Sequence, residues 1–273
     1  MGNMKFDFAG ETAVITGAAT GIGRCSAVSF AKAGANVAVC DFNEEKASET
    51  VSLCKNEGVQ AKFYKMDVTA DAAAICAVRD EILQDFREIN ILHSNAGIAQ
   101  KKAGPPMMEI PDSEWEHVFD VNVFGNVKVC REFAEAMKPQ NKGKIVITAS
   151  ISAYQPTPFL PVYHMSKVSV LNLMMSLSVE LGNYNINVNA VNPGFVYTPI
   201  YSEGGALELG KKIPGLQDIK DGETVINAMA SQSSLHRAQT PEDIANAVMF
   251  LCSDAAREIT GQALNVDSGI IRR

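Results

Sequence analysis

Two residues four positions apart carry the chemistry that this sequence suggests first. Tyr163 and Lys167 are separated by one helical turn, so on a helix both side chains share a face. A phenol has an ordinary pKa of about 10, which is too high for ready proton exchange at neutral pH. A cation about 4 Å away stabilises a phenolate by roughly 4 kcal/mol at an effective dielectric constant of about 20, which brings that pKa down toward neutrality. The pair therefore predicts an acid/base centre.

A glycine-rich turn, Thr16–Gly23, stands far upstream of this pair, between a predicted strand and a predicted helix. Gly17 permits a tight turn, Gly21 lets the backbone approach a pyrophosphate, and Gly23 allows the helix to pack closely on the strand. The start of the helix offers free N–H groups to the anion. The turn therefore predicts a dinucleotide site.

An acidic residue, Asp41, ends the second predicted strand, about twenty residues after the turn. A carboxylate at this point can accept hydrogen bonds from both ribose hydroxyls of an adenosine, and it repels a 2′-phosphate. NAD is therefore favoured over NADP.

These features occur in one chain with Asn95-Ala96-Gly97, Asn122, Ser150 thirteen positions before Tyr163, and Pro193-Gly194. With this set the chain resembles a short-chain dehydrogenase/reductase, and the likeness runs from about Thr12 to Asp267. The spacing of the turn, G-x-x-x-G-x-G, is that family's form. The resemblance implies an NAD-dependent oxidoreductase that transfers hydride between a secondary alcohol (hydroxysteroid, polyol or small diol) and NAD, or reduces the ketone. A non-catalytic, nucleotide-sensing regulator on the same fold is the alternative, although a sensor has no need of an intact catalytic set.

The resemblance also assigns roles to the catalytic set. It implies that Tyr163 is the acid/base and that Lys167 lowers its pKa and binds the nicotinamide ribose. Ser150 donates a hydrogen bond to the developing oxyanion or carbonyl. Ser152 competes for this role, but the offset from Tyr163 favours Ser150. Asn122, in a predicted long helix, is expected to hold the water that links Lys167 to solvent.

Further cofactor contacts follow from the resemblance. Asp67 and Val68 match the adenine contact, the Asn95 motif stabilises the sheet beside the cofactor, and Val196 and Thr198 match the positions that hold the carboxamide. Arg24 is interpreted as a helix residue and not as a clamp for a 2′-phosphate. The expected cofactor-binding residues are Gly17, Thr20, Gly21, Ile22, Gly23, Asp41, Phe42, Asp67, Val68, Asn95, Ala96, Gly97, Tyr163, Lys167, Pro193, Gly194, Val196 and Thr198.

The substrate pocket is expected beside the catalytic set. The residues predicted to contact substrate are Ser150, Ile151, Gln155, Tyr163, Phe195 and Tyr197. The long segment Tyr197–Gln239 is punctuated by glycines, with short helical patches at Leu207–Lys212 and Thr224–Ser231. We expect it to be a substrate-binding lid, because a loop this long in a compact domain is usually functional.

The elements that must position these residues alternate between short apolar runs and helical patterns, which is typical of a parallel sheet with crossover helices. The prediction is a single α/β domain over residues 1–273, a Rossmann fold with a doubly wound, seven-stranded parallel sheet flanked by helices. Strands are expected at Ala13–Thr16, Val37–Cys40, Ala61–Lys65, Ile89–Ser94, Lys144–Thr148, Asn187–Val191 and Ala263–Val266. Helices are expected at Ile22–Ala33, Glu44–Asn56, Ala70–Phe86, Glu114–Met137, Val162–Leu181 and Pro241–Cys252.

Two helix starts are predicted from side-chain chemistry. Ser113 and Glu116 fit a capping box, and Thr240 precedes a proline at the first helical position. The two long helices, Glu114–Met137 and Val162–Leu181, carry apolar residues beyond one stripe, so each needs a second partner besides its own sheet. The resemblance and closed symmetry together predict a homotetramer. The apolar residues concerned are Val127, Val129, Leu171, Leu173, Met174 and Met175.

Composition excludes several classes of function. Of the 273 residues, 47% are hydrophobic and 20% charged, as in a globular protein with a large core, and the net charge of −7 argues against nucleic-acid binding. The N-terminus has no signal-like run, and no segment approaches the roughly 20 apolar residues that cross a bilayer. His93, His117 and His236 lack metal-site spacing, and the six scattered cysteines have no C-x-x-C pair. We therefore expect a cytoplasmic protein with reduced cysteines, no membrane partner and no metal.

Overall fold

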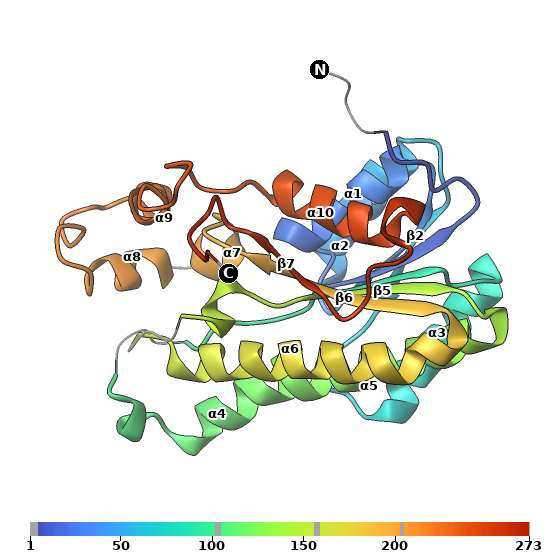
Figure 1. Ribbon diagram of the computed structural model, residues 1–273, viewed down its shortest axis with the longest axis horizontal. Helices are drawn as coiled ribbons and strands as arrows, with labels where there is room; N and C mark the ends of the chain where they lie inside the picture. Colours follow the sequence, from blue (N-terminus) through green and yellow to red (C-terminus); the bar gives the residue numbers. More distant parts are fainter. Residues whose placement is uncertain (1–4, 102–104, 156–158, 203–204, 273) are drawn as a thin grey trace.

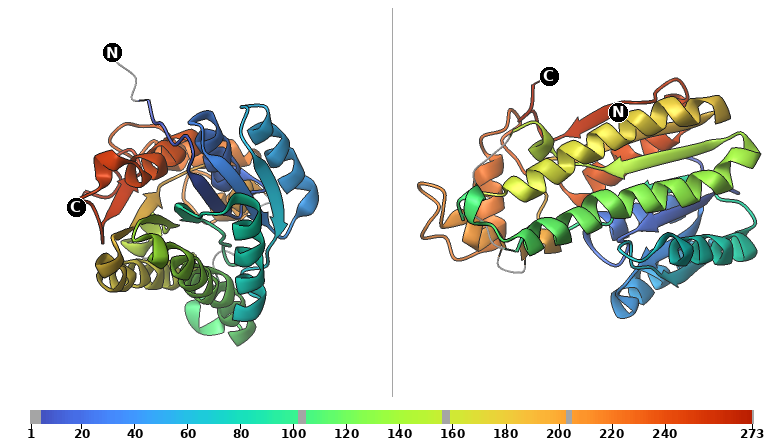
Figure 2. Two further views of the ribbon diagram at one scale, coloured as in Figure 1. Left: turned by 90° about the vertical axis from the view of Figure 1, so that its right-hand side faces the viewer. Right: turned by 90° about the horizontal axis from the view of Figure 1, so that it is seen from below.

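The computed structural model describes residues 5–101, 105–155, 159–202 and 205–272. Seven parallel strands form one sheet in the order β3-β2-β1-β4-β5-β6-β7. Helices cover both faces, α1, α2 and α10 on one side and α3 to α6 on the other (Figures 1 and 2). The order reverses direction at β1, as in a doubly wound Rossmann sheet, so the predicted fold class is confirmed.

The strands are short and mostly buried on both faces, which explains why they read as apolar runs. They are β1 (Thr12–Thr16), β2 (Asn36–Asp41), β3 (Ala61–Lys65), β4 (Ile91–Ser94), β5 (Gly143–Thr148), β6 (Ile186–Pro193) and β7 (Ala263–Val266). The helices are α1 (Gly21–Lys32), α2 (Glu44–Lys55), α3 (Ala72–Phe86), α4 (Asp112–Phe119), α5 (Asn126–Met137), α6 (Pro161–Leu181), α7 (Pro199–Ser202), α8 (Gly205–Gly210), α9 (Gly222–Ala230) and α10 (Pro241–Cys252).

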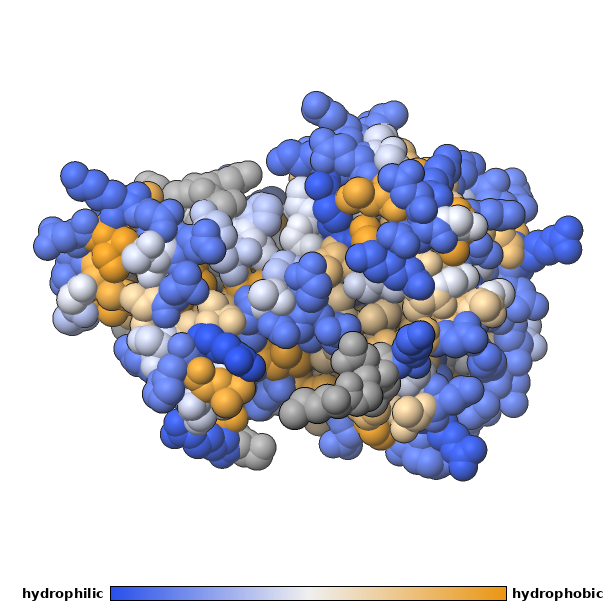
Figure 3. All heavy atoms as spheres, turned by 90° about the horizontal axis from the view of Figure 1, so that it is seen from above, coloured by the Kyte–Doolittle hydropathy of each residue, from blue (hydrophilic) through white to orange (hydrophobic). Residues whose placement is uncertain are grey.

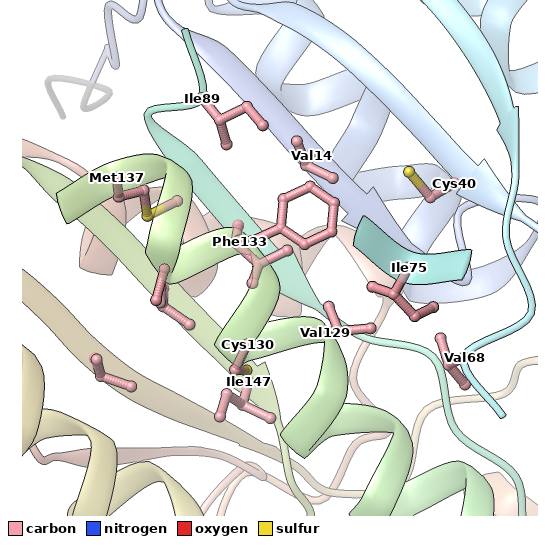
Figure 4. Close-up of a cluster of buried hydrophobic side chains, with 14 of the residues drawn as sticks. Val14, Cys40, Val68, Ile75, Ile89, Val129, Cys130, Phe133, Met137 and Ile147 are labelled. Atoms are coloured by element: carbon pink, nitrogen blue, oxygen red, sulfur yellow. The ribbon is translucent and has the colours of Figure 1, made fainter. Parts of the chain in front are cut away.

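Two apolar clusters hold the layers together, one on each face of the sheet. Phe133 of α5 lies fully buried beside Val14, Ile89 and Val129, between the sheet and its covering helices (Figure 4). The second cluster joins the opposite face of the sheet to α1, α2 and α10. The residues of one strand alternate between the clusters, Leu92 in the first and Ile91 in the second, as the period of two requires.

The two predicted helix starts have different outcomes. At α10 the capping box is present, because Thr240 Oγ1 accepts from the Asp243 N–H at 3.3 Å and Asp243 Oδ2 accepts from the Thr240 N–H at 2.8 Å. The capping box predicted at Ser113 is wrong. Helix α4 begins two residues earlier than predicted, at Asp112, with Pro111 at the cap and no side-chain cap bond, so Ser113 lies inside the first turn.

The single helix predicted over Glu114–Met137 is interrupted. A π-helical segment, Asp120–Gly125, separates α4 from α5. Asn126 Nδ2 donates to the Asn122 carbonyl at 2.7 Å, and a Cβ on Gly125 would meet Val68 at 2.9 Å. Such π segments are frequent at functional sites, and this one contains Asn122.

The segment after β6 is largely helical, with α7, α8 and α9 extending beyond the sheet (Figure 1). The predicted patches at Leu207–Lys212 and Thr224–Ser231 correspond to α8 and α9, each shifted by two residues at its start. Seen from above, the surface is mostly hydrophilic with smaller apolar patches (Figure 3). Within the described ranges, no helix is both long enough and apolar enough to cross a membrane.

Candidate active site

The glycine turn lies where β1 ends and α1 begins. Gly17 and Gly21 have positive φ angles of 64° and 56°, a conformation that favours glycine. A Cβ on Gly23 would collide with the Gly17 carbonyl oxygen and lie 2.7 Å from Asn95 Nδ2. The first amides of a helix have no intrahelical partner, and the Thr20 side chain does not cap them. The turn is therefore an open cradle of N–H groups that fits a pyrophosphate.

Asp41, which the sequence predicts to bind a ribose, supports the turn. It ends β2 with only 7% of its surface exposed. Its Oδ2 accepts from the Ala19 N–H at 2.9 Å, and its Oδ1 accepts from the Asn43 N–H at 2.9 Å. Each oxygen keeps a second acceptor site, so the carboxylate can still receive hydroxyl donors.

The neighbouring Arg24 is engaged within the protein. Its Nε donates to the Ala19 carbonyl at 2.8 Å and to Thr50 Oγ1 at 3.0 Å. Its Nη2 donates to the Lys46 carbonyl and pairs with Glu49 at 2.8 Å. These contacts agree with the interpretation of Arg24 as a structural residue.

Three predicted adenine-side residues lie along the same edge of the sheet. Phe42 follows Asp41 and is 74% exposed, so its ring is available to a ligand. The carboxylate of Asp67 accepts from the hydroxyl and the N–H of Thr69, which holds its pKa below the usual range. Val68 packs beside Gly125 of the π segment.

Asn95 joins three strand ends beneath the turn. Its Nδ2 donates to the carbonyls of Thr16 at 3.1 Å and Gly17 at 3.4 Å. Its Oδ1 accepts from Thr148 Oγ1 at 3.1 Å, and its N–H donates to Thr16 Oγ1 at 2.9 Å. The expected stabilising role of this asparagine therefore has a geometric basis across β1, β4 and β5. Ser94, directly before Asn95, donates to Asn126 Oδ1 at 2.7 Å.

Tyr163 and Lys167 lie on α6 as the spacing predicts. Lys167 Nζ is 5.6 Å from the centroid of the Tyr163 ring and donates to the Thr148 carbonyl at 2.8 Å. Lys167 is 3% exposed, and burial lowers the pKa of its ammonium to about 8. That value is still above neutrality, so the group is mainly charged at pH 7 and stabilises a nearby phenolate.

Ser150 caps a short 3-10 helix, Ile151–Ala153, directly after β5. Its Oγ accepts from the Ser152 N–H at 3.1 Å, which leaves the hydroxyl proton available for another acceptor. Ser152 thus contributes its backbone to the support of Ser150.

Asn122 is fully buried, and its side chain is engaged by protein groups. Its Oδ1 accepts from the Ile98 N–H at 2.8 Å, and its Nδ2 donates to the Ile98 carbonyl at 2.9 Å and to Ser166 Oγ at 3.0 Å. Ser166 Oγ in turn donates to the Tyr163 carbonyl at 2.7 Å. Through these bonds the side chain joins the end of β4 to α6, and the water-holding role of Asn122 stays a prediction.

The exit of β6 lies against the glycine turn. A Cβ on Gly21 would be 3.4 Å from Thr198 Cβ. Val196 is 3% exposed and forms an isolated parallel bridge with Gln239. The cofactor residues expected after Pro193-Gly194 are thus beside those expected from the turn.

The residues predicted for the substrate pocket differ in exposure. Ile151 is buried, Phe195 is half-buried, and Gln155 and Tyr197 are exposed. Tyr197 approaches α9, since a Cβ on Gly222 would lie 3.5 Å from its ring. Tyr197, the first residue of the predicted lid, therefore lies beside a helix of the same segment.

Several residues of the site were not predicted from the sequence. They are Thr16, Thr148, Asn126 and Ser166, which bond to Asn95, Lys167, Ser94 and Asn122 as described above. One feature of the sequence could have identified them: each is a polar residue at the end of a buried strand or on the inner face of a helix. An unpaired polar group is costly there, so such a residue is expected to have a hydrogen-bond partner. Among the described residues, no group of three or more His, Cys, Asp or Glu could hold a metal ion.

Comparison with known proteins gives full-length matches. A family model described as Enoyl-(Acyl carrier protein) reductase matches residues 17–271. The chain is 35% identical over 269 residues to galactitol 2-dehydrogenase of Rhizobium johnstonii, covering 97% of this chain and 96% of that protein. It is 30% identical over 267 residues to 7alpha-hydroxysteroid dehydrogenase of Escherichia coli, covering 98% and 96%.

Solved structures of a dehydrogenase and a reductase also match nearly the whole chain. NAD+-bound xylitol dehydrogenase superposes with a TM-score of 0.88 at 29% identity, covering 96% of this chain and 99% of that one. L-sorbose reductase of Gluconobacter frateurii, in complex with NADPH and L-sorbose, gives 0.87 at 30% identity, covering 99% and 100%. A nicotinamide dinucleotide is thus bound in both, NAD+ in one and NADPH in the other.

Proposed function

We propose that this chain interconverts a secondary alcohol and its ketone with NAD. The chain belongs to the short-chain dehydrogenase/reductase family and is an oxidoreductase acting on CH–OH groups. The observation that carries the proposal is the buried Lys167 ammonium, which lies beside Tyr163 and donates to the carbonyl of Thr148, two residues before Ser150. A nucleotide sensor has no need of this constellation.

The proposed chemistry assigns each side chain a task. The nicotinamide, when bound, supplies the hydride acceptor. The Tyr163 oxygen takes the hydroxyl proton of the alcohol, and the Lys167 charge stabilises the phenolate that does so. The Ser150 hydroxyl donates to the substrate oxygen, because the bond that it accepts from the Ser152 N–H leaves its own proton free for this purpose.

Support for NAD comes from the ribose end of the site. The Asp41 carboxylate is fixed by two backbone N–H groups and would lie against a 2′-phosphate. Arg24 has its guanidinium engaged by protein groups and offers that phosphate little. We therefore propose that Gly17, Gly21, Gly23, Asp41 and the other expected cofactor residues bind NAD in preference to NADP.

A homotetramer is proposed from the outer face of α6. Val168, Met175 and Val179 are 51%, 47% and 80% exposed, and Phe124 of the neighbouring π segment is 55% exposed. Of the residues predicted for this contact, Met175 belongs to the exposed stripe, whereas Val129, Leu171 and Met174 are buried against the protein's own core. An apolar stripe of this extent fits contact with a second copy.

The substrate class can be tested directly. Purified protein is incubated with NAD and a panel of polyols, hydroxysteroids and small diols, and the absorbance of the reduced cofactor is followed. We expect turnover with at least one class of secondary alcohol. A protein that binds NAD and oxidises no member of the panel, and reduces none of the matching ketones, would favour the regulator.

A further inference from the structure

A histidine in the middle of the sheet is not used by the chemistry proposed above. His93 of β4 has 0% exposure and is in register with Val146 of β5. Its Nε2 lies 2.9 Å from Oγ1 of Thr148, the next residue of β5 on the same face. Burial lowers the pKa of the imidazole to about 3, so the ring is neutral at pH 7 and carries one proton.

The neighbouring hydrogen bonds determine where that proton sits. Asn95 Nδ2 faces the carbonyl oxygens of Thr16 and Gly17, which only accept, so the atom facing Thr148 is Oδ1. An amide oxygen also only accepts, so the Thr148 hydroxyl donates its single proton to it. Thr148 Oγ1 must then accept from His93, which places the imidazole proton on Nε2. His93 Nδ1 is buried, with no hydrogen-bond partner among the described residues.

Thr148 connects this histidine to the catalytic lysine. While its hydroxyl is held by His93 and Asn95, its carbonyl accepts from Lys167 Nζ at 2.8 Å. Ser150 follows two residues later. One residue at the end of β5 therefore holds the ammonium in place, and His93 supplies one of the two bonds that fix its side chain.

We propose that His93 is a positioning residue: by donating to Thr148 it fixes the end of β5 and so holds Lys167 and Ser150 in place beside Tyr163. The proposal rests on the proposed function of that centre. It also explains why a polar ring that is costly to bury occupies the interior of the sheet. The competing explanation is that His93 merely fills volume in the core.

Two substitutions separate these explanations. Leucine and glutamine have similar volumes, but only the amide nitrogen of glutamine can replace Nε2 as a donor. We expect His93→Leu to lower kcat on the order of tenfold, because a small displacement of a positioned group has effects of this size, and to shift the apparent pKa of the kcat/KM profile. The Kd for NAD should stay within about twofold, and His93→Gln should retain most of kcat and the wild-type profile. The proposal would be overturned if His93→Leu had the kcat and the pH profile of the wild type. It would also be overturned if His93→Leu and His93→Gln lost kcat equally.

A double-mutant cycle tests the path through Thr148. If His93 acts through the hydroxyl, the double variant His93→Leu/Thr148→Val should be no slower than Thr148→Val alone. Additive losses would contradict this path. Ser26→Ala is the matched control, since Ser26 is equally buried and its hydroxyl has no partner in the part of the chain that the structure describes; its kcat should equal that of the wild type.

Two spectroscopic readouts do not depend on turnover. In nitrogen-15 spectra of histidine-labelled protein, the His93 signal can be assigned because it is lost in His93→Gln. We expect this signal to be that of the Nε2–H tautomer, and a signal of the Nδ1–H tautomer would refute the deduction. Titration of labelled Lys167 should give a different pKa in His93→Leu than in wild type, and an unchanged titration would contradict the positioning role. If no alcohol is oxidised while both readouts behave as expected, the proposed function fails and the positioning stands.

Discussion

The glycine turn offers the most quantitative prediction. Gly23→Ala would place a methyl group on the Gly17 carbonyl, 2.8 Å from its carbon and 2.7 Å from Asn95 Nδ2. The backbone contact cannot be relieved by a side-chain rotation, and overpacking of this kind costs about 1–3 kcal/mol. Displacing Asn95 also weakens its bonds to Thr16 and Gly17, each worth about 1 kcal/mol. The expected loss in the free energy of unfolding is therefore about 3 kcal/mol.

This loss is measurable by thermal unfolding. For a chain of this size we expect the Tm to fall by roughly 6–12 °C. The Kd for NAD should rise by at least about tenfold, because the displaced Gly17 belongs to the cradle. Gly182→Ala is the control: Gly182 has φ of −56°, and no heavy atom of the described residues lies within 4 Å of the added Cβ. A Gly23→Ala protein with the Tm and NAD affinity of the Gly182→Ala control would refute the assignment of the turn.

Three further predictions follow from the site and the surface. Asp41→Asn keeps an acceptor for the Ala19 N–H but removes the charge, so the ratio of kcat/KM for NAD over NADP should fall on the order of tenfold. Asp41→Ala should also lower this ratio, and an unchanged ratio would contradict the role of Asp41 in selecting NAD. Deletion of residues 204–221, which removes α8, should damage substrate KM and kcat while leaving NAD affinity nearly intact; equal loss of NAD affinity would place the segment in the cofactor-binding core. Val168→Asp on the exposed stripe should convert a tetramer to smaller species in light scattering, and a wild-type protein of monomer mass would refute the oligomer.

Much of the fold could be predicted because its strands carry a strong local signal. The bounds of Ala61–Lys65, Ala263–Val266 and Pro241–Cys252 agree with β3, β7 and α10, and the order of strands and helices along the chain is as predicted. Buried parallel strands are nearly continuous apolar runs, and the Thr240 cap lies within three residues of its partner. Both signals are local, so neither requires knowledge of tertiary contacts.

The features that the sequence did not predict depend on contacts between distant segments. Asn122 of the π segment bonds to Ile98, which lies 24 positions away, and no helical pattern contains that information. The bond between His93 and Thr148 spans 55 positions and exists only in the register of β4 on β5. Ser113 misled the prediction because a capping box and a first-turn serine look alike until the cap geometry is known.

The most direct test of the central claim is the turnover of Tyr163→Phe beside the wild type, with NAD and an alcohol that the wild type oxidises. This change removes the transferable proton while keeping the ring over which Lys167 lies. We expect kcat to fall by two or more orders of magnitude with nearly unchanged Kd for NAD, since proton transfer contributes about 10²–10⁴-fold. Near-normal turnover in the Tyr163→Phe protein would show that Tyr163 is not the acid/base.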